Sequence, residues 1–228
     1  MRQNLPKGFN LYLTFAALFI AALVSCNLIF QKFFFWAPFG ENLVFEISVG
    51  ILPYPLTFLF TDIISEIFGR RAANRVVLAG LLASLFTLLI VGLALTVPAT
   101  SWSPINDETF SKVFGLQGAA VAASMLAYMG AQLVDIRIFH FWKKKTQGKH
   151  LWIRNNASTM LSQMLDTATV LLVLCWAGAI EWERFGALFV NGYLFKAMFA
   201  AIDTPILYLL VKKMRKHYGL KPNEDLGF

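Results

Sequence analysis

Polar side chains recur at helical spacing inside one of the most apolar stretches of this chain, residues 158–180 and the turn before it. Asn156, Gln163, Asp166 and Thr167 lie at offsets of 0, 7, 10 and 11, which places all four on one face of a helix. A carboxylate beside amide and hydroxyl groups can bind a ligand that has several hydrogen-bond donors. We therefore treat this face as a candidate binding surface.

A second apolar stretch, residues 187–211, carries Lys196 and Asp203 seven residues apart, again on one helical face. A charge in the middle of a bilayer costs on the order of 3 kcal/mol, so such groups pair with each other or face a cavity. Lys196 is expected to pair with Asp203 or with Asp166. The pair either clamps two helices or lines a cavity, and the uncharged polar neighbours favour the cavity.

A third group of acidic residues follows two prolines. Pro53 and Pro55 interrupt the apolar stretch 44–66, and Asp62 and Glu66 come next, four residues apart on one face. Because proline removes a backbone donor and clashes one turn back, the sequence predicts a helix broken at Pro53 and Pro55. Asp62 and Glu66 are either binding groups or the charged end of the helix.

Motifs for nucleotide, metal or nucleophile chemistry are absent from the sequence. There is no phosphate-binding Gly-x-x-x-x-Gly-Lys-Ser/Thr loop and no Gly-x-Gly-x-x-Gly fingerprint. The three histidines never occur in His-Glu-x-x-His spacing. We predict no catalytic residue, no metal, no cofactor and no ATPase within the chain.

The elements that must position these residues are long apolar helices. Hydrophobic residues make up 57% of the 228 residues and charged ones 14%, against about 25% charged in soluble domains. A helix needs roughly 20 apolar residues to cross a bilayer. Six stretches qualify, namely 11–31, 44–66, 76–97, 113–138, 158–180 and 187–211. The short connections predict an all-α integral membrane protein with about six transmembrane helices and one domain, 1–228.

Basic residues fall in alternate connections. Sixteen of the 20 lysines and arginines lie in the N-terminal segment, at 70–75, at 137–154 and at 212–221. Cytoplasmic loops carry such an excess, so both termini are predicted to be cytoplasmic in a multi-pass protein of the bacterial cytoplasmic (inner) membrane. The net charge of +7 is then a matter of membrane orientation, and no nucleic-acid partner is expected.

Three blocks of residues resemble one known family. They are Tyr54-Pro55-Leu56-Thr57-Phe58-Leu59 with Asp62, Glu66 and Gly69-Arg70-Arg71; Asn155-Asn156 with Ser162-Gln163 and Asp166-Thr167; and Tyr193 and Lys196 with Asp203-Thr204-Pro205. In this order they resemble the signature of the queuosine precursor transporter family, also called the vitamin uptake transporter family. Phe68 stands where that family more usually has tyrosine.

The resemblance implies a fold and a substrate. The fold is that of the substrate-binding subunits of energy-coupling-factor importers. The substrates are 7-deazaguanine precursors of queuosine, in the 7-cyano or 7-aminomethyl form, for salvage into tRNA. A carboxylate can accept two adjacent donors of a guanine-like edge. Either Asp166, with Gln163 and Asn156, or Asp62 with Glu66 fits this role.

Three functions compete. The first and favoured one is a transporter that works alone on a small 7-deazaguanine. The second is a substrate-binding subunit that needs an external ATP-driven module, and the third is an intramembrane enzyme that uses its carboxylates. The expected partners are the small-molecule substrate and the lipid bilayer, and the sequence leaves a homo-oligomer open.

Overall fold

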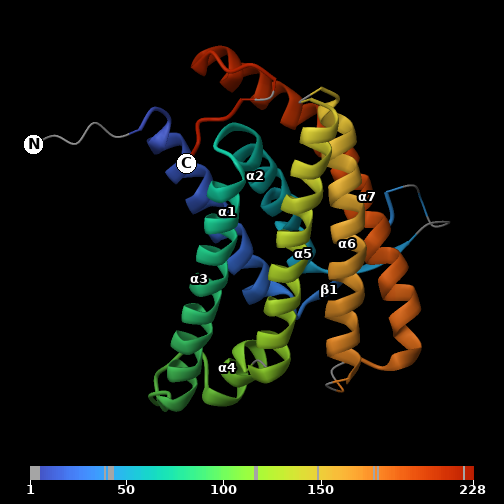
Figure 1. The fold of residues 1–228 in the computed structure, drawn as a ribbon. Helices are drawn as coiled ribbons and strands as arrows, with labels where there is room; N and C mark the ends of the chain where they lie inside the picture. Colours follow the sequence, from blue (N-terminus) through green and yellow to red (C-terminus); the bar gives the residue numbers. More distant parts are fainter. Residues whose placement is uncertain are drawn as a thin grey trace, which may run out of the picture.

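A computed structural model describes residues 6–38, 40, 44–115, 118–147, 149–176, 178, 180–222 and 224–228. Its helices are α1 (Phe9–Ile29), α2 (Tyr54–Ile67), α3 (Arg70–Thr96), α4 (Asp107–Phe114), α5 (Gly118–Lys145), α6 (Leu151–Trp176) and α7 (Trp182–Tyr218). A hairpin of β1 (Phe33–Trp36) and β2 (Phe45–Ser48), followed by the 3-10 turn η1 (Val49–Ile51), joins α1 to α2. Figure 1 shows the long helices side by side.

Among the described residues, α1, α3, α6 and α7 are long and apolar enough to cross a membrane. This confirms a helical membrane protein, while the number of six crossings stays a prediction. The start of α1 and the C-terminus lie at the end of the bundle where α2 meets α3 and α5 meets α6 (Figure 1). The C-terminal end of α3 and the C-terminal end of α6 lie at the opposite end.

The segment predicted as a helix over 44–66 is helical only in its second half. Helix α2 has Pro53 at its N-cap and Pro55 in its first turn. Proline is tolerated there, because the first N–H groups of a helix have no partner within it. Residues 45–48 instead form β2, which pairs antiparallel with β1, Phe45 opposite Trp36 and Ser48 opposite Phe33. The prolines mark the start of a short helix rather than a break between two helical halves.

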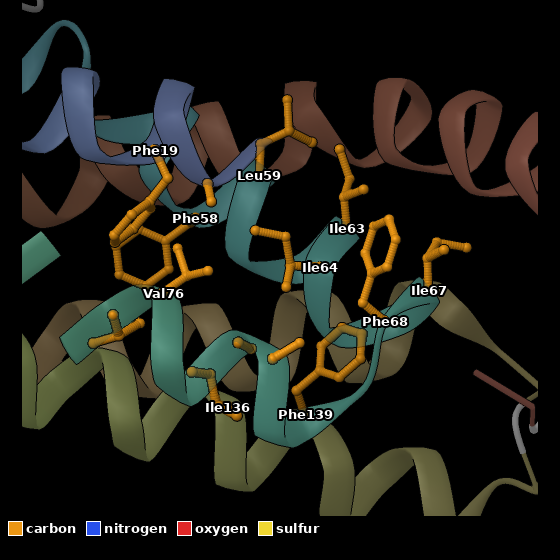
Figure 2. Packing of buried hydrophobic residues seen from close by; sticks show 14 of the residues in the cluster. Phe19, Phe58, Leu59, Ile63, Ile64, Ile67, Phe68, Val76, Ile136 and Phe139 are labelled. Atoms are coloured by element: carbon orange, nitrogen blue, oxygen red, sulfur yellow. The ribbon is translucent and has the colours of Figure 1, made fainter. Parts of the chain in front are cut away.

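Helix α2 is the most buried element of the bundle. It contacts α1, α3, α5 and α7. Ile63, Ile64 and Ile67 have no exposed surface, nor does Phe68 just beyond the helix. Figure 2 shows these side chains packed with Phe19, Val76, Ile136 and Phe139. Helices in a bilayer associate through close van der Waals packing rather than through transfer of apolar surface out of water, and this packing fixes α2 at the centre of the protein.

Helix α7 is longer than a membrane is thick. Its 37 residues, at about 1.5 Å each, exceed the roughly 30 Å of hydrocarbon in a bilayer. Pro205 lies inside it, and beyond that point its C-terminal part leans across the end of the bundle (Figure 1). The last turn of α7 is thereby brought to the end of α2.

Candidate functional site

A cavity of about 220 Å³ lies between the C-terminal part of α1, the hairpin, and facing segments of α2, α3, α5, α6 and α7. Its wall is mainly apolar, with Leu23, Ile47, Ile51, Val77, Leu81 and Leu171 among its residues. Polar groups occur at two places on this wall. Cavities of this composition, with a few convergent polar groups, are the usual form of a small-molecule site.

The first polar group joins α2, α6 and α7. Lys196 Nζ lies 2.7 Å from Asp166 Oδ2 and 3.0 Å from Thr167 Oγ1. The hydroxyl of Tyr54 donates to the same Asp166 oxygen. Lys196 also lies 4.1 Å from the centre of the Tyr54 ring, within the range of a cation–π interaction. We call Tyr54, Asp166, Thr167 and Lys196 the central cluster.

The central cluster is buried but incompletely satisfied. The side chains of Asp166 and Lys196 are 3% and 9% exposed. Asp166 Oδ1 has no hydrogen-bond partner among the described residues. A buried acceptor without a partner costs about 1–3 kcal/mol, so a ligand that donates to it is favoured. The ion pair therefore both joins α6 to α7 and lies on the cavity wall, so the clamp and cavity interpretations describe the same residues.

Aromatic rings form one side of the cavity. Tyr54 and Tyr128 are edge to face with ring centres 5.5 Å apart, and Phe58 lies 5.5 Å from Tyr54. The Tyr128 hydroxyl accepts a hydrogen bond from Gln132 at 2.5 Å. Sequence reasoning missed Tyr128, because a lone tyrosine on an alanine-rich helix resembles ordinary packing. Such rings offer a flat surface for a planar ligand.

The second polar group lies near the hairpin. Asn27 donates to Ser84 at 3.3 Å, and Glu46 and Ser48 from β2 contribute to the same wall. Glu46 also lies 3.5 Å from Arg184, in an exposed pair. None of these residues belongs to the predicted site set. Glu46 and Ser48 belong to a segment that was expected to be part of a helix, and its pairing with β1 as a strand brings them to the cavity.

The structure places the other predicted residues away from this cavity. Asp62 and Asp203 line a separate space of about 10 Å³ with Asn155 and Thr159. In the described part of the chain, Lys196 pairs with Asp166, and no ion pair joins it to Asp203. Of the two pairings left open by the sequence, the structure therefore has the one with Asp166.

The predicted residues Asn156, Gln163 and Glu66 also lie outside the cavity lining. Asn156 donates to Thr204 at 3.0 Å and to a backbone carbonyl of its own helix. Gln163 is buried, and its carbonyl oxygen has no hydrogen-bond partner among the described residues. Glu66 lies at the far end of α2, beside Arg215 and Lys143. Of the eight predicted residues, the cavity brings together Asp166, Thr167 and Lys196.

The described residues contain no group of three or more His, Cys, Asp or Glu side chains placed to hold an ion. Cys26 lines the cavity, and both it and Cys175 are free and buried.

Comparison with known proteins gives a consistent result. The profile of a family described as "Putative vitamin uptake transporter" matches residues 48–210, more than half of the chain. A "Probable queuosine precursor transporter" of Bacillus subtilis (strain 168) is 28% identical over 170 residues, 73% of this chain and 72% of that protein. The "Queuosine precursor transporter" of Escherichia coli (strain K12) is 24% identical over 160 residues, 69% of each chain.

A third relative is also named as a queuosine precursor transporter. A "Probable queuosine precursor transporter" of Haemophilus influenzae (strain ATCC 51907 / DSM 11121 / KW20 / Rd) is 26% identical over 170 residues, 72% of this chain and 67% of that protein. No solved structure matches the chain. The matched region contains α2 to α6 and most of α7, and with them the central cluster. The chain belongs to the vitamin uptake transporter family.

Proposed function

We propose that this protein imports 7-deazaguanine precursors of queuosine, the 7-cyano form, the 7-aminomethyl form or both, across the bacterial cytoplasmic membrane. The names of three relatives support the substrate class. The observation that carries the proposal is the central cluster on the wall of a largely apolar cavity. A cavity of about 220 Å³ is smaller than the roughly 300–1,000 Å³ of drug-sized sites, which suits a ligand of two fused rings.

Asp166 is the residue that we propose recognises the guanine-like edge of the substrate. A guanine-like edge presents a ring N–H beside an amino group, and a carboxylate accepts both with strong charge-assisted bonds. Tyr54 and Lys196 hold one oxygen of Asp166, and the other oxygen lacks a protein partner among the described residues. The aromatic side of the cavity, with Tyr54 and Tyr128, offers a surface on which the bicyclic ring stacks.

The arrangement favours recognition of the guanine-like edge by Asp166 over recognition by Asp62 with Glu66. Neither Asp62 nor Glu66 is among the residues that line the cavity. Gln163 and Asn156, the expected partners of Asp166, are also absent from its lining. Thr167 and Lys196 lie beside Asp166 instead and are the proposed partners for the ligand's oxygen side.

The proposed topology has six crossings with both termini in the cytoplasm. Its support is the sequence distribution of the basic residues, sixteen of which lie in the terminal segments and in alternate connections. The sequence has no nucleotide-binding motif, so the proposed transporter works without ATP hydrolysis of its own. Dependence on an external ATP-driven module is the alternative that the experiment must separate.

The test is uptake in cells that lack their own synthesis and import of queuosine precursors. We expect that expression of this protein, together with labelled 7-cyano-7-deazaguanine or its 7-aminomethyl form, restores queuosine in tRNA. The host should contain no energy-coupling-factor module. Restoration only when such a module is supplied would support the binding-subunit alternative. Absence of both uptake and binding, with protein present in the membrane, would refute the proposed substrate.

A further inference from the structure

We propose that the ends of α2, α5 and α7, together with the C-terminal tail, form the gate that closes the cavity on the side of the basic loops. The tail is defined here as residues 219–228, of which 219–222 and 224–228 are described. The inference rests on the proposed transport function, and the gate residues lie outside the proposed binding cavity. It assigns to Glu66 a role in closing the protein rather than in contacting substrate.

The first argument is that the cavity occupies only one half of the bundle. Its α2 contribution is Tyr54, the first residue of that helix. The remaining turns of α2, from Phe58 to Phe68, lie in the packed core with α1, α3, α5 and α7 (Figure 2). A substrate bound beside Tyr54 is therefore separated from the basic-loop side by packed side chains and must wait for them to move.

The second argument is an ionic cluster that joins three helix ends. The fully buried Glu66 pairs with Arg215 of α7 through one carboxylate oxygen. Its other oxygen lies 3.5 Å from Lys143 of α5, and the same ammonium donates to the Glu66 carbonyl at 3.2 Å. Removing one member of such a buried cluster leaves the remaining charge poorly compensated. The ends of α2, α5 and α7 therefore separate only if these contacts break together.

The third argument is that the tail covers this cluster. Arg215 also donates to the carbonyls of Lys221, Pro222 and Glu224. One guanidinium thus joins the carboxylate of Glu66 to the backbone of the tail. Nη1 donates to Lys221, while the two hydrogens of Nη2 are shared among Glu66, Pro222 and Glu224, so the planar guanidinium contacts all four residues from one position.

The tail then returns to the end of α2. Leu226 N donates to Ile67 O at 2.8 Å, and Phe228 N donates to Phe68 O at 3.0 Å. The Phe228 ring lies 5.2 Å from the rings of both Phe68 and Tyr12. These contacts satisfy the last carbonyls of α2 and add apolar packing above the core. The tail is therefore part of the closed bundle rather than a loose extension.

The fourth argument is that α2 links this closure to the cavity. Tyr54 at its first residue donates to Asp166, and Glu66 lies twelve residues later, about 18 Å along the helix. Pro53 bounds α2 at its N-terminal end, and Gly69 bounds it at its C-terminal end. Gly69 has a positive φ of 94°, which few other residues adopt. A change at Asp166 on ligand binding can thus move α2 as one unit and loosen Glu66.

The experiment locks the tail to α1. Tyr12→Cys and Phe228→Cys are combined and joined in the membrane by a short bis-methanethiosulfonate reagent, whose disulfide links a reductant removes. Cys26 and Cys175 stay in place because both are buried. The control is Phe110→Cys with Phe114→Cys in α4, whose rings are 4.9 Å apart at the other end of the bundle. Binding and uptake of labelled 7-cyano-7-deazaguanine are measured before linking, after linking and after reduction.

We expect linking of the tail to reduce uptake by the protein at least tenfold, while substrate binding changes by no more than about twofold. Reduction of the link should restore uptake. Linking of the α4 pair should leave uptake unchanged. Unchanged uptake through the linked tail would refute the gate. Loss of binding together with uptake on linking would also refute it, since the tail would then support the binding site itself. Failure of the substrate to bind before any linking would instead refute the proposed function.

Discussion

At the cavity wall, one carboxylate oxygen of Asp166 is held by Tyr54 and Lys196, and the other has no hydrogen-bond partner among the described residues. This arrangement gives the carboxylate a fixed orientation and one buried acceptor without a partner. A hydrogen bond that involves a charged group contributes about 1.5–3 kcal/mol. The chemistry of a single side chain therefore carries much of the proposed affinity.

Asp166→Asn is expected to reduce uptake per folded molecule by about 10- to 100-fold, because an amide donates where the ligand also donates and the charge is lost. The measurement is uptake of the labelled precursor, divided by the amount of folded protein in the membrane. Asp107→Asn is the matched control, since Asp107 is exposed in α4. Normal uptake by Asp166→Asn would show that Asp166 does not read the substrate.

Lys196→Met is expected to lower the amount of folded protein, because it leaves the buried Asp166 carboxylate without its cation at a cost of about 3–5 kcal/mol. Adding Asp166→Asn removes the leftover charge, so abundance should recover while uptake stays low. Abundance is measured by fluorescence-detected gel filtration and uptake as above. Recovery of uptake in the double variant would mean that the pair serves only to hold α6 against α7.

For single residues, helical spacing indicated which side chains share a face of one helix but not which partners they meet. Helical spacing placed Asp166 and Thr167 on one face of α6, and they line the cavity with Lys196. Spacing within a helix says nothing about rotation relative to its neighbours. For that reason Asp203, seven residues from Lys196, was an equal candidate for the ion pair and faces a different space.

Among the elements, α2 and the hairpin before it determine where the cavity ends. Ser48 accepts a hydrogen bond from Gly50 N at 3.1 Å and donates to the carbonyl of Phe30, which ties η1 to the end of α1. Gly50 packs so closely on α1 that an added Cβ would lie 2.7 Å from the Cys26 carbonyl oxygen. The approach of these two segments shapes the outer wall.

Gly50→Ala is therefore expected to destabilise the folded protein by about 1–3 kcal/mol, the usual cost of overpacking. The added methyl meets backbone atoms, which cannot rotate away as a side chain can. Apparent melting temperature in detergent is the measurement. Gly92→Ala is the control, because a Cβ at Gly92 of α3 meets nothing within 4 Å. Equal melting temperatures for the two variants would contradict the close approach at Gly50.

The hairpin is also where sequence reasoning failed at the scale of elements. Hydropathy over 44–66 indicated a span, because the window averages β2 and α2 into one apolar run. Alternation of apolar and polar residues in Phe45-Glu46-Ile47-Ser48 is the signal that favours a strand. Four residues are too few for that signal to outweigh hydropathy, and the partner strand is contributed by a separate segment.

For the whole molecule, the distribution of charge predicts the orientation in the membrane. Reporter fusions at residue 228 and within the 98–112 connection are expected to report opposite compartments, the cytoplasm for the C-terminus. Alkaline phosphatase and green fluorescent protein activities, compared at each site, give the measurement. The same compartment for both positions would contradict the proposed topology.

The hairpin has a consequence for the route by which a substrate arrives. A sheet of two strands has two outer edges, and the hydrocarbon of a bilayer does not tolerate backbone N–H and C=O groups facing lipid tails. The hairpin must therefore be bathed by water or covered by protein, although it lies beside helices that lipid surrounds. Since β2 supplies Glu46, Ile47 and Ser48 to the cavity wall, water that bathes the hairpin also reaches the cavity from that side. In that case we expect a ligand to come as a dissolved molecule from the aqueous phase, without first partitioning into the lipid.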